Sequence, residues 1–289
     1  MNHIPEYIFA ISTSVLLIGS LFVFHRFWAK TTKTIWVRLV IFAWILASQI
    51  WFYVHEQIFN SSIPETFMYW ELCNIVTWST LFLMIMPSKF QVDIFMPLAI
   101  IGPLLTIVVP TEESTAFGFN TFRYYNYYFG HLGALFGYLY IYLFDYTGAR
   151  LNWQSMRRTT IFSFGLLTFV MVWNMAYLPE TSNPLKPLPE EADLASYWGP
   201  NYIYRDIIYN LGLGNLSLIT QYLLMIFIFG PMVLIWGWTA MFFARPIYAN
   251  HGTEKLKFNI KEDILSIKTT FTKDNFKMIA EIIKQKIRP

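Results

Sequence analysis

Residues 122–144 read FRYYNYYFGHLGALFGYLYIYLF, an unbroken apolar and aromatic run with one charge near its start, Arg123, and one histidine, His131. An α-helix needs about 20 such residues to cross a hydrocarbon layer of about 30 Å, because each residue adds about 1.5 Å. This stretch therefore predicts a membrane-spanning helix that carries an ionisable side chain.

Runs of the same kind recur on both sides of this stretch. They cover roughly residues 7–25, 35–55, 66–86, 91–110, 159–178 and 217–243. Hydrophobic residues make up 55% of the chain and charged residues 13%, whereas soluble domains carry about 25% charged residues. We therefore predict an all-α membrane protein, a bundle of about seven transmembrane helices.

Positive charge is concentrated in alternate loops of this predicted bundle. Of the 21 lysines and arginines, 18 follow the first, third, fifth and seventh runs. Only Arg123, Lys186 and Arg205 lie in the other loops, which are rich in acidic residues. Because basic loops stay on the cytoplasmic side, we predict an outside N-terminus, a cytoplasmic C-terminus and a multi-pass protein of the cell membrane.

The chain divides into two regions of different composition. Residues 1–246 form the predicted transmembrane domain, in which residues 179–216 are a long outer loop. Residues 247–289 are a polar, Lys-rich tail with apolar residues at helical spacing. We predict that this tail forms a basic amphipathic helix on the cytoplasmic surface, where anionic lipid attracts lysine. The start, MNHIPEY, lacks the basic region of a secretion signal, so we expect the first run to be retained.

Cysteine usage and charge exclude several classes of protein. The single cysteine, Cys73, rules out an intramolecular disulfide and a thiolate metal cluster. The chain contains no Gly-rich phosphate loop, and we predict neither a cofactor nor a nucleic-acid partner. Asp93 and Asp145 stand at cytoplasmic ends of their runs beside Lys89 and Arg150. We interpret both as solvated ion pairs.

The remaining polar residues within the runs gather toward the outer side. Ionisable groups inside a membrane are costly unless partnered or wet, so each is a functional candidate. His55, Glu56, Glu71 and His131 all lie in the outer half of the predicted bundle. Cys73 is seven residues, or about 10 Å, below the outer start of its run. His131 lies at a comparable depth, so the cysteine and the histidine share a level.

Two interpretations of these residues remain open. A lone cysteine in a membrane is usually a small packing residue, and a histidine can simply bond a neighbouring helix. His131, however, sits among Gly130, Gly133 and Gly137, which let another helix approach closely. We expect its ring to be directed into the bundle.

If Cys73 and His131 meet, they form a nucleophile and its base. The imidazole withdraws the thiol proton, the thiolate attacks an ester, and a thioester carries the acyl group. Burial alone disfavours a thiolate, so the histidine or a positive dipole must favour it. Candidate oxyanion donors at this depth are Asn74, Asn174 and Tyr177.

Two acidic residues are candidates for supporting His131, but we do not interpret them as metal ligands. Glu56 or Glu71 is a candidate third member that orients His131. His55, Glu56, His131 and Cys73 are residue types that zinc accepts as ligands. Because adjacent residues such as His55 and Glu56 point about 100° apart on a helix, we predict no metal site.

The order of several motifs resembles a known family. These are YWELCNI at 69–75, IIGPLLTIVVPTEES at 100–114, FRYYNYYFGHLGAL at 122–135, and later VWNMAYL, KP and YWGPNYIY. Over roughly residues 35–240 they resemble the YwaF-type integral membrane family, which is related to transmembrane protein 164. The resemblance implies an acyltransferase that uses a cysteine and a histidine on phospholipids.

The resemblance assigns roles to two positions. Cys73 stands at the acyl-accepting cysteine, and His131, 58 residues later, stands at the partner histidine. The chain differs from the family just before the cysteine, where it has Trp70, Glu71 and Leu72. Its elements around Asn174, Tyr177 and Lys186–Pro187 are also more loosely spaced. These differences bear on the acceptor lipid more than on the pair.

We therefore predict a thiol (Cys/His) acyltransferase of the outer leaflet. It takes an acyl chain from a membrane phospholipid through a thioester on Cys73. The acceptor is a lysophospholipid, an ether lipid or the amino end of a lipoprotein. The alternative is a proton-linked transporter or lipid scramblase, in which Glu56, Glu71 and His131 line a polar path. A receptor-like or scaffold bundle ranks third.

Overall fold

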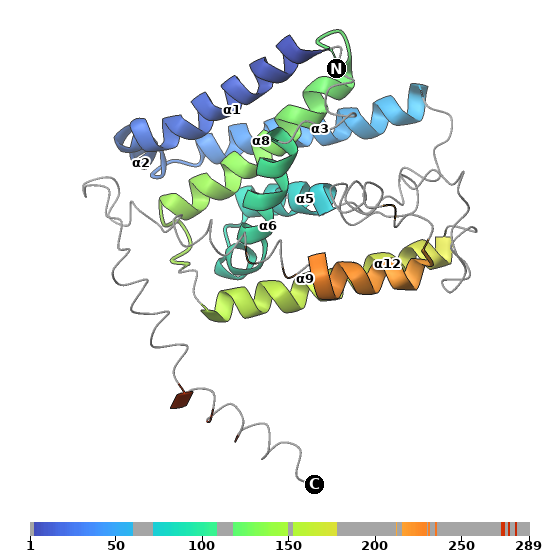
Figure 1. Cartoon of the computed structure of the whole chain (residues 1–289). Coiled ribbons are helices and arrows are strands. Elements are labelled where there is room, and N and C mark those ends of the chain that lie inside the picture. The colour runs from blue at the N-terminus through green and yellow to red at the C-terminus, as the bar shows by residue number, and fades with distance from the viewer. Residues whose placement is uncertain are drawn as a thin grey trace.

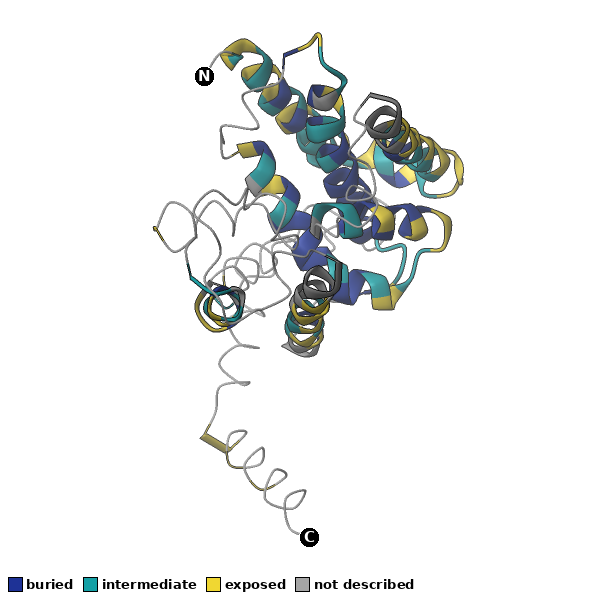
Figure 2. Cartoon of the chain, turned by 90° about the vertical axis from the view of Figure 1, so that its right-hand side faces the viewer, coloured by how far each residue is buried: buried dark blue, intermediate teal, exposed yellow. Residues whose placement is uncertain are grey.

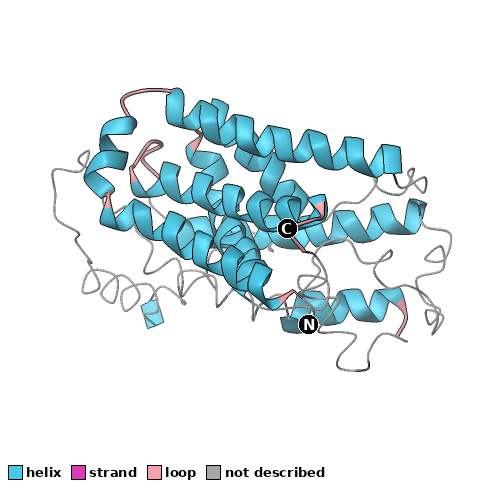
Figure 3. Ribbon diagram, turned by 90° about the horizontal axis from the view of Figure 1, so that it is seen from above, coloured by secondary structure: helices cyan, strands magenta, loops and turns pink. Residues whose placement is uncertain are grey.

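The computed structural model of the chain describes residues 3–59, 72–108, 118–149, 153–177, 212, 216–229, 231, 235, 273, 274, 277 and 281. Within these residues the chain is helical and contains no β-strand (Figure 3). The predicted outer loop falls almost entirely outside the described residues. So does most of the tail, of which Lys273, Asp274, Lys277 and Glu281 are helical and exposed.

The helices follow the apolar runs of the sequence (Figure 1). They are α1 (Ile4–Val23), α2 (His25–Thr31), α3 (Trp36–Phe59), α5 (Leu72–Ile85), α6 (Lys89–Val108), α8 (Phe122–Leu143), α9 (Trp153–Tyr177), α12 (Leu218–Leu224) and the π-helical turn η2 (Met225–Phe229). Each predicted run overlaps one of these helices. The short helix α2 lies in the basic stretch after the first run and was not expected.

Length and composition single out a smaller number of membrane-spanning helices. Among the described residues, α1 and α6 are long and apolar enough to cross a membrane. Helix α2 and the first part of α3 together make a third candidate, although they meet at an angle of 92°. The prediction of a helical protein with membrane-spanning segments is confirmed at this level.

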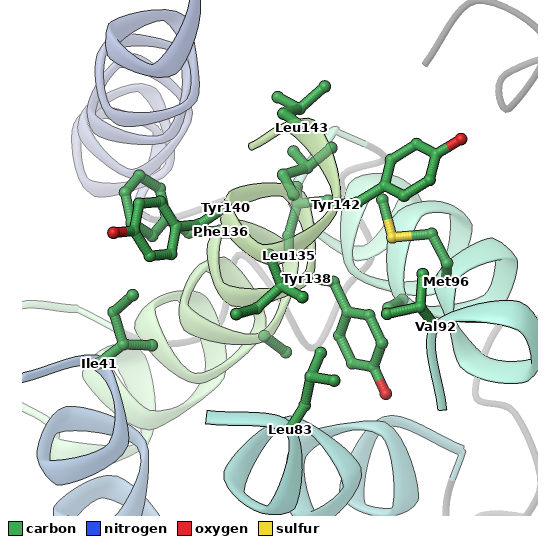
Figure 4. Packing of buried hydrophobic residues seen from close by; sticks show 14 of the residues in the cluster. Ile41, Leu83, Val92, Met96, Leu135, Phe136, Tyr138, Tyr140, Tyr142 and Leu143 are labelled. Carbon is green, nitrogen blue, oxygen red and sulfur yellow. The ribbon is translucent and has the colours of Figure 1, made fainter. Parts of the chain in front are cut away.

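Helix α8 is the centre of the bundle. All its residues from Leu132 to Leu143 are buried, and it contacts α1, α3, α5 and α6. Figure 4 shows its side chains pointing outward in several directions: Tyr138 lies near Leu83 of α5, and Tyr142 lies near Met96 of α6. A helix that is apolar all round is one that neighbours surround. The apolar run at residues 122–144, which forms α8, is therefore the core of the fold.

Glycines let the neighbouring helices approach α8 closely, as the sequence predicted. A Cβ atom added at Gly133 would lie 3.1 Å from Ile45 Cγ1 of α3. One added at Gly137 would lie 2.8 Å from Thr80 Cγ2 of α5 and 3.5 Å from Ile41 Cγ2 of α3. Three helices thus converge at Gly137.

This close packing makes Gly137→Ala destabilising. Alanine normally favours a helix over glycine by about 0.5–1 kcal/mol, but here its methyl group overlaps Thr80, and overpacking costs about 1–3 kcal/mol. We expect a lower thermal unfolding temperature in detergent. Gly102→Ala is the matched control, because nothing lies within 4 Å of its added Cβ. The double change Gly137→Ala with Thr80→Ser removes Cγ2 and should restore stability. Equal effects of Gly137→Ala and Gly102→Ala would contradict this account of the packing.

Helix α9 compensates for a proline in α6. Pro97 has no N–H, so the carbonyl of Asp93, four residues earlier, lacks its helical donor. The Thr159 hydroxyl donates to that carbonyl at 2.9 Å. The Asp93 carboxylate receives Ser155 Oγ at 3.1 Å and Arg158 Nη1 at 3.0 Å. Asp93 is 2% exposed, so the interpretation of a solvated ion pair with Lys89 is wrong: its partners belong to α9, and it is buried.

The outer surface of the described helices is strongly apolar. Figure 2 shows exposed residues along the outward faces of the helices and buried ones between them. Leu16 of α1 is 74% exposed, Trp36 of α3 is 71% exposed and Phe227 of η2 is 71% exposed. Soluble monomers rarely expose apolar surface on this scale, and a lipid bilayer removes the cost.

Candidate functional site

Cys73 is the second residue of α5, and its side chain is partly exposed. The Thr77 hydroxyl, one turn later, donates to the Cys73 backbone carbonyl at 2.7 Å. Asn74, the neighbouring oxyanion candidate, is also partly exposed. The first turn of a helix carries backbone N–H groups without partners in their own helix, and it favours negative charge. Cys73 lies within the first turn of α5 as the structure describes it.

His131 is held by its own helix, α8. Its Nδ1 atom contacts the backbone carbonyl of Tyr127, one turn earlier. A carbonyl oxygen only accepts hydrogen bonds, so Nδ1 carries the proton and donates it. In the neutral ring the lone pair is then on Nε2. The Tyr127 ring also packs on the imidazole, with centroids 5.1 Å apart. The contact with the Tyr127 carbonyl thus selects one tautomer of the neutral ring.

The packing of α5 on α8 relates the two residues. Ser79 and Tyr138 share a hydrogen bond of 2.5 Å, and Thr80 approaches Gly137. The two helices run in the same direction (Figure 1). The contacts between them join residues 53 to 59 positions apart, from Met84 with Gly137 to Ser79 with Tyr138, and Cys73 and His131 are 58 apart.

Cys73 and His131 are each seven residues, nearly two full turns, from a residue at the contact of α5 with α8: Cys73 from Thr80 and His131 from Tyr138. Residues seven apart lie on one face of a helix. That Cys73 and His131 meet remains a prediction.

Helix α3 packs against α8 next to His131. It runs opposite to α8 (Figure 1), and its Ser48 hydroxyl donates to Asn126 Oδ1 at 2.7 Å. Ser48 Oγ lies 3.7 Å from the position of a Cβ at Gly130, the residue before His131. The next residue of α3, Gln49, is 4% exposed and its Oε1 has no hydrogen-bond partner.

Sequence reasoning missed Gln49, Ser48 and Asn126 because it considered ionisable side chains. A signal for Gln49 was present. Ile41, Ile45 and Gln49 recur every four residues, and the structure buries all three. A buried amide in an otherwise apolar stripe costs free energy unless it is hydrogen-bonded, so it is a functional candidate just as a buried charge is.

The other predicted residues are placed by their backbones alone or lie outside the described residues. His55 and Glu56 belong to the last turns of α3, seven and eight residues, or about 10–12 Å, beyond Ser48. Asn174 and Tyr177 belong to the last turn of α9. The described residues do not include Glu71. The supporting roles of these five residues remain predictions.

Within the described ranges, no three His, Cys, Asp or Glu side chains gather in a way that would hold a metal ion. Among the described side chains toward this end of the bundle are the Cys73 thiol, the His131 imidazole, the amides of Gln49 and Asn126 and the Ser48 hydroxyl.

Long apolar helices, with large apolar side chains exposed on the outside of the bundle, define this chain as a helical membrane protein. The family model of the TMEM164 family matches residues 1–204. The match covers more than half of the 289 residues, and the chain belongs to this family. The predicted relation to transmembrane protein 164 is confirmed, and the YwaF-type name remains a prediction. No curated protein and no solved structure matches the chain.

Proposed function

We propose that this protein is an integral membrane lipid acyltransferase that moves an acyl chain from a phospholipid, through a thioester on Cys73, to a lipid or lipoprotein acceptor. The packing of α5 on α8 supports the proposal, because its contacts join residues about as far apart in sequence as Cys73 and His131. The Nδ1 contact of His131 with Tyr127 supports it too, because it puts the lone pair of the neutral ring on Nε2.

The first half-reaction forms the thioester. His131 Nε2 takes the proton of the Cys73 thiol, and the sulfur attacks the ester carbonyl of the donor phospholipid. The carbonyl oxygen carries the negative charge of the tetrahedral intermediate. The candidate donors to this oxygen are backbone N–H groups in the first turn of α5 and the Asn74 amide. The C–O bond then breaks, and the lysophospholipid oxygen leaves with the proton from Nε2.

The second half-reaction transfers the acyl group. The acceptor hydroxyl or amine gives its proton to His131 Nε2 as it attacks the thioester carbonyl. The C–S bond breaks, and Cys73 leaves as the thiolate, which recovers the proton. The cycle consumes one ester and forms one ester or amide, so it needs no oxidant, reductant or nucleotide.

Topology decides which leaflet supplies the lipids. We propose seven membrane spans with the N-terminus outside and the C-terminus in the cytoplasm, because 18 of 21 basic residues follow alternate runs. Cys73 lies near the start of α5 and His131 in the first half of α8. In that orientation both lie in the outer half of the bilayer, where donor and acceptor come from the outer leaflet.

The test is to trap the thioester. Purified protein incubated with a labelled diacyl phospholipid should gain the mass of one acyl chain, and neutral hydroxylamine should remove it. Cys73→Ser is the matched variant, because an oxygen ester at this position resists neutral hydroxylamine. A hydroxylamine-labile adduct of equal yield on Cys73→Ser would reject the assignment.

A further inference from the structure

We propose that Gln49 binds the attacking hydroxyl of a lysophospholipid acceptor, through its side-chain Oε1 atom, beside the Cys73 thioester. The inference rests on the acyltransferase function proposed above. It assigns a residue to the second half-reaction, in which the acceptor is distinguished from the donor.

The first observation is a buried polar atom without a partner. Gln49 is 4% exposed, and its Oε1 accepts no hydrogen bond. Leaving such an atom unsatisfied costs about 1–3 kcal/mol. Apolar residues would fill this place on α3 without that cost, as Ile41 and Ile45 do on the same stripe. The cost is removed if a bound molecule supplies the missing donor.

The second observation is the position of Gln49. Ile41, Thr80 and Gly137 converge where α3, α5 and α8 meet. Gln49 lies eight residues from Ile41, Cys73 seven from Thr80 and His131 six from Gly137. At about 1.5 Å per residue these steps are about 12, 10 and 9 Å.

From the point where the three helices meet, Gln49, Cys73 and His131 all lie toward the same end of the bundle. Helix α3 runs opposite to α5 and α8 (Figure 1), and a higher residue number on α3 corresponds to a lower one on the other two. Gln49 therefore shares the level of the thiol and the imidazole, on the buried side of its helix. The three side chains come from three helices that surround one level.

The hydrogen-bonding chemistry of Gln49 Oε1 indicates which group binds it. A carboxamide oxygen only accepts, so the ligand must bring an O–H or N–H group. A neutral hydroxyl meets this condition without burying a charge, which is costly, and it is the group that attacks in a lysophospholipid. In the bound acceptor the hydroxyl donates its one hydrogen to Gln49 Oε1. As the oxygen attacks, that hydrogen turns to His131 Nε2, which takes the proton.

The experiment separates the two half-reactions. Wild-type protein and Gln49→Leu, a change that keeps the volume, are loaded from a labelled diacyl phosphatidylcholine, and the hydroxylamine-labile adduct is measured. Lysophosphatidylethanolamine is then added, and the single-turnover loss of the adduct to the acceptor is followed. We expect adduct formation within about twofold of wild type and transfer slowed about 10- to 100-fold, with a higher acceptor concentration needed for half-maximal rate.

The matched control is Gln91→Leu. Gln91 is a second glutamine with a buried Oε1 that lacks a partner, and it lies in the first turn of α6, next to Lys89. This change should leave both half-reactions unaltered, because that turn lies in the predicted cytoplasmic half.

Several results would overturn the inference. Transfer from Gln49→Leu at the wild-type rate rejects the role of Gln49 and leaves the acyltransferase standing. Loss of the adduct itself in Gln49→Leu rejects a role confined to the acceptor. If a lipopeptide with a free amine is the acceptor that depends on Gln49, the hydroxyl assignment is rejected. Failure of the wild type to form any adduct rejects the proposed function, and the inference with it.

Discussion

Cys73→Ala is expected to abolish acyl transfer, lowering turnover by about 10⁴-fold or more, as removal of a covalent nucleophile does in other acyl-transfer enzymes. No second cysteine exists to replace it. The measurement is movement of a labelled acyl chain from phosphatidylcholine to a lysophospholipid in reconstituted vesicles. Unfolding temperature provides the control for folding, because a partly exposed residue in the first turn of α5 contributes little packing.

The same variant separates the acyltransferase from its rival. A proton-linked transporter or lipid scramblase has no need of a thiol, so its flux should persist in Cys73→Ala vesicles. Retained lipid or proton flux, together with absent acyl transfer in the wild type, would favour the transporter. Retained acyl transfer in Cys73→Ala would exclude a thioester on this residue.

Replacement of His131 is expected to slow acyl transfer by about 10²- to 10⁴-fold, the usual contribution of a general base. Two substitutions make the test specific. His131→Ala removes the ring and its contact with Tyr127. His131→Asn keeps an N–H donor near the position of Nδ1 but has no basic nitrogen in place of Nε2.

A base and a structural histidine give different patterns. If His131 is the base, both variants are slow, and their rates rise with pH as the thiol ionises without help. If His131 only binds the carbonyl of Tyr127, His131→Asn recovers most of the activity and the stability. That recovery would remove His131 from the catalytic pair.

The helices were predictable from sequence, whereas the contacts that align them were not. A run of apolar residues is a local signal, and α1, α3, α6, α8 and α9 begin and end within a few residues of the predicted limits. The Ser79–Tyr138 bond joins residues 59 positions apart, and no local pattern encodes such a pairing. Depth counted from the predicted membrane surface puts Cys73 and His131 at one level, but it does not say which sides of the two helices face each other.

Two errors had the same physical origin. Asp93 was paired with Lys89 because they are close in sequence, yet its partner Arg158 comes from α9. Gln49 was passed over because it carries no charge, yet its amide lies as deep as the isoleucines beside it. In both cases tertiary packing decided the environment of a side chain whose local sequence looked ordinary.

The contact between His131 and Tyr127 has a mechanical consequence. Both residues belong to α8, so the ring is aimed by its own backbone and needs no partner helix to hold it. The second half of α8, residues 132–143, is buried among its neighbours, and this packing holds the helix in place. If a lipid enters between the helices, as the proposed function requires, a shift of α3 or α5 away from α8 would not turn the imidazole, because its contact lies within α8.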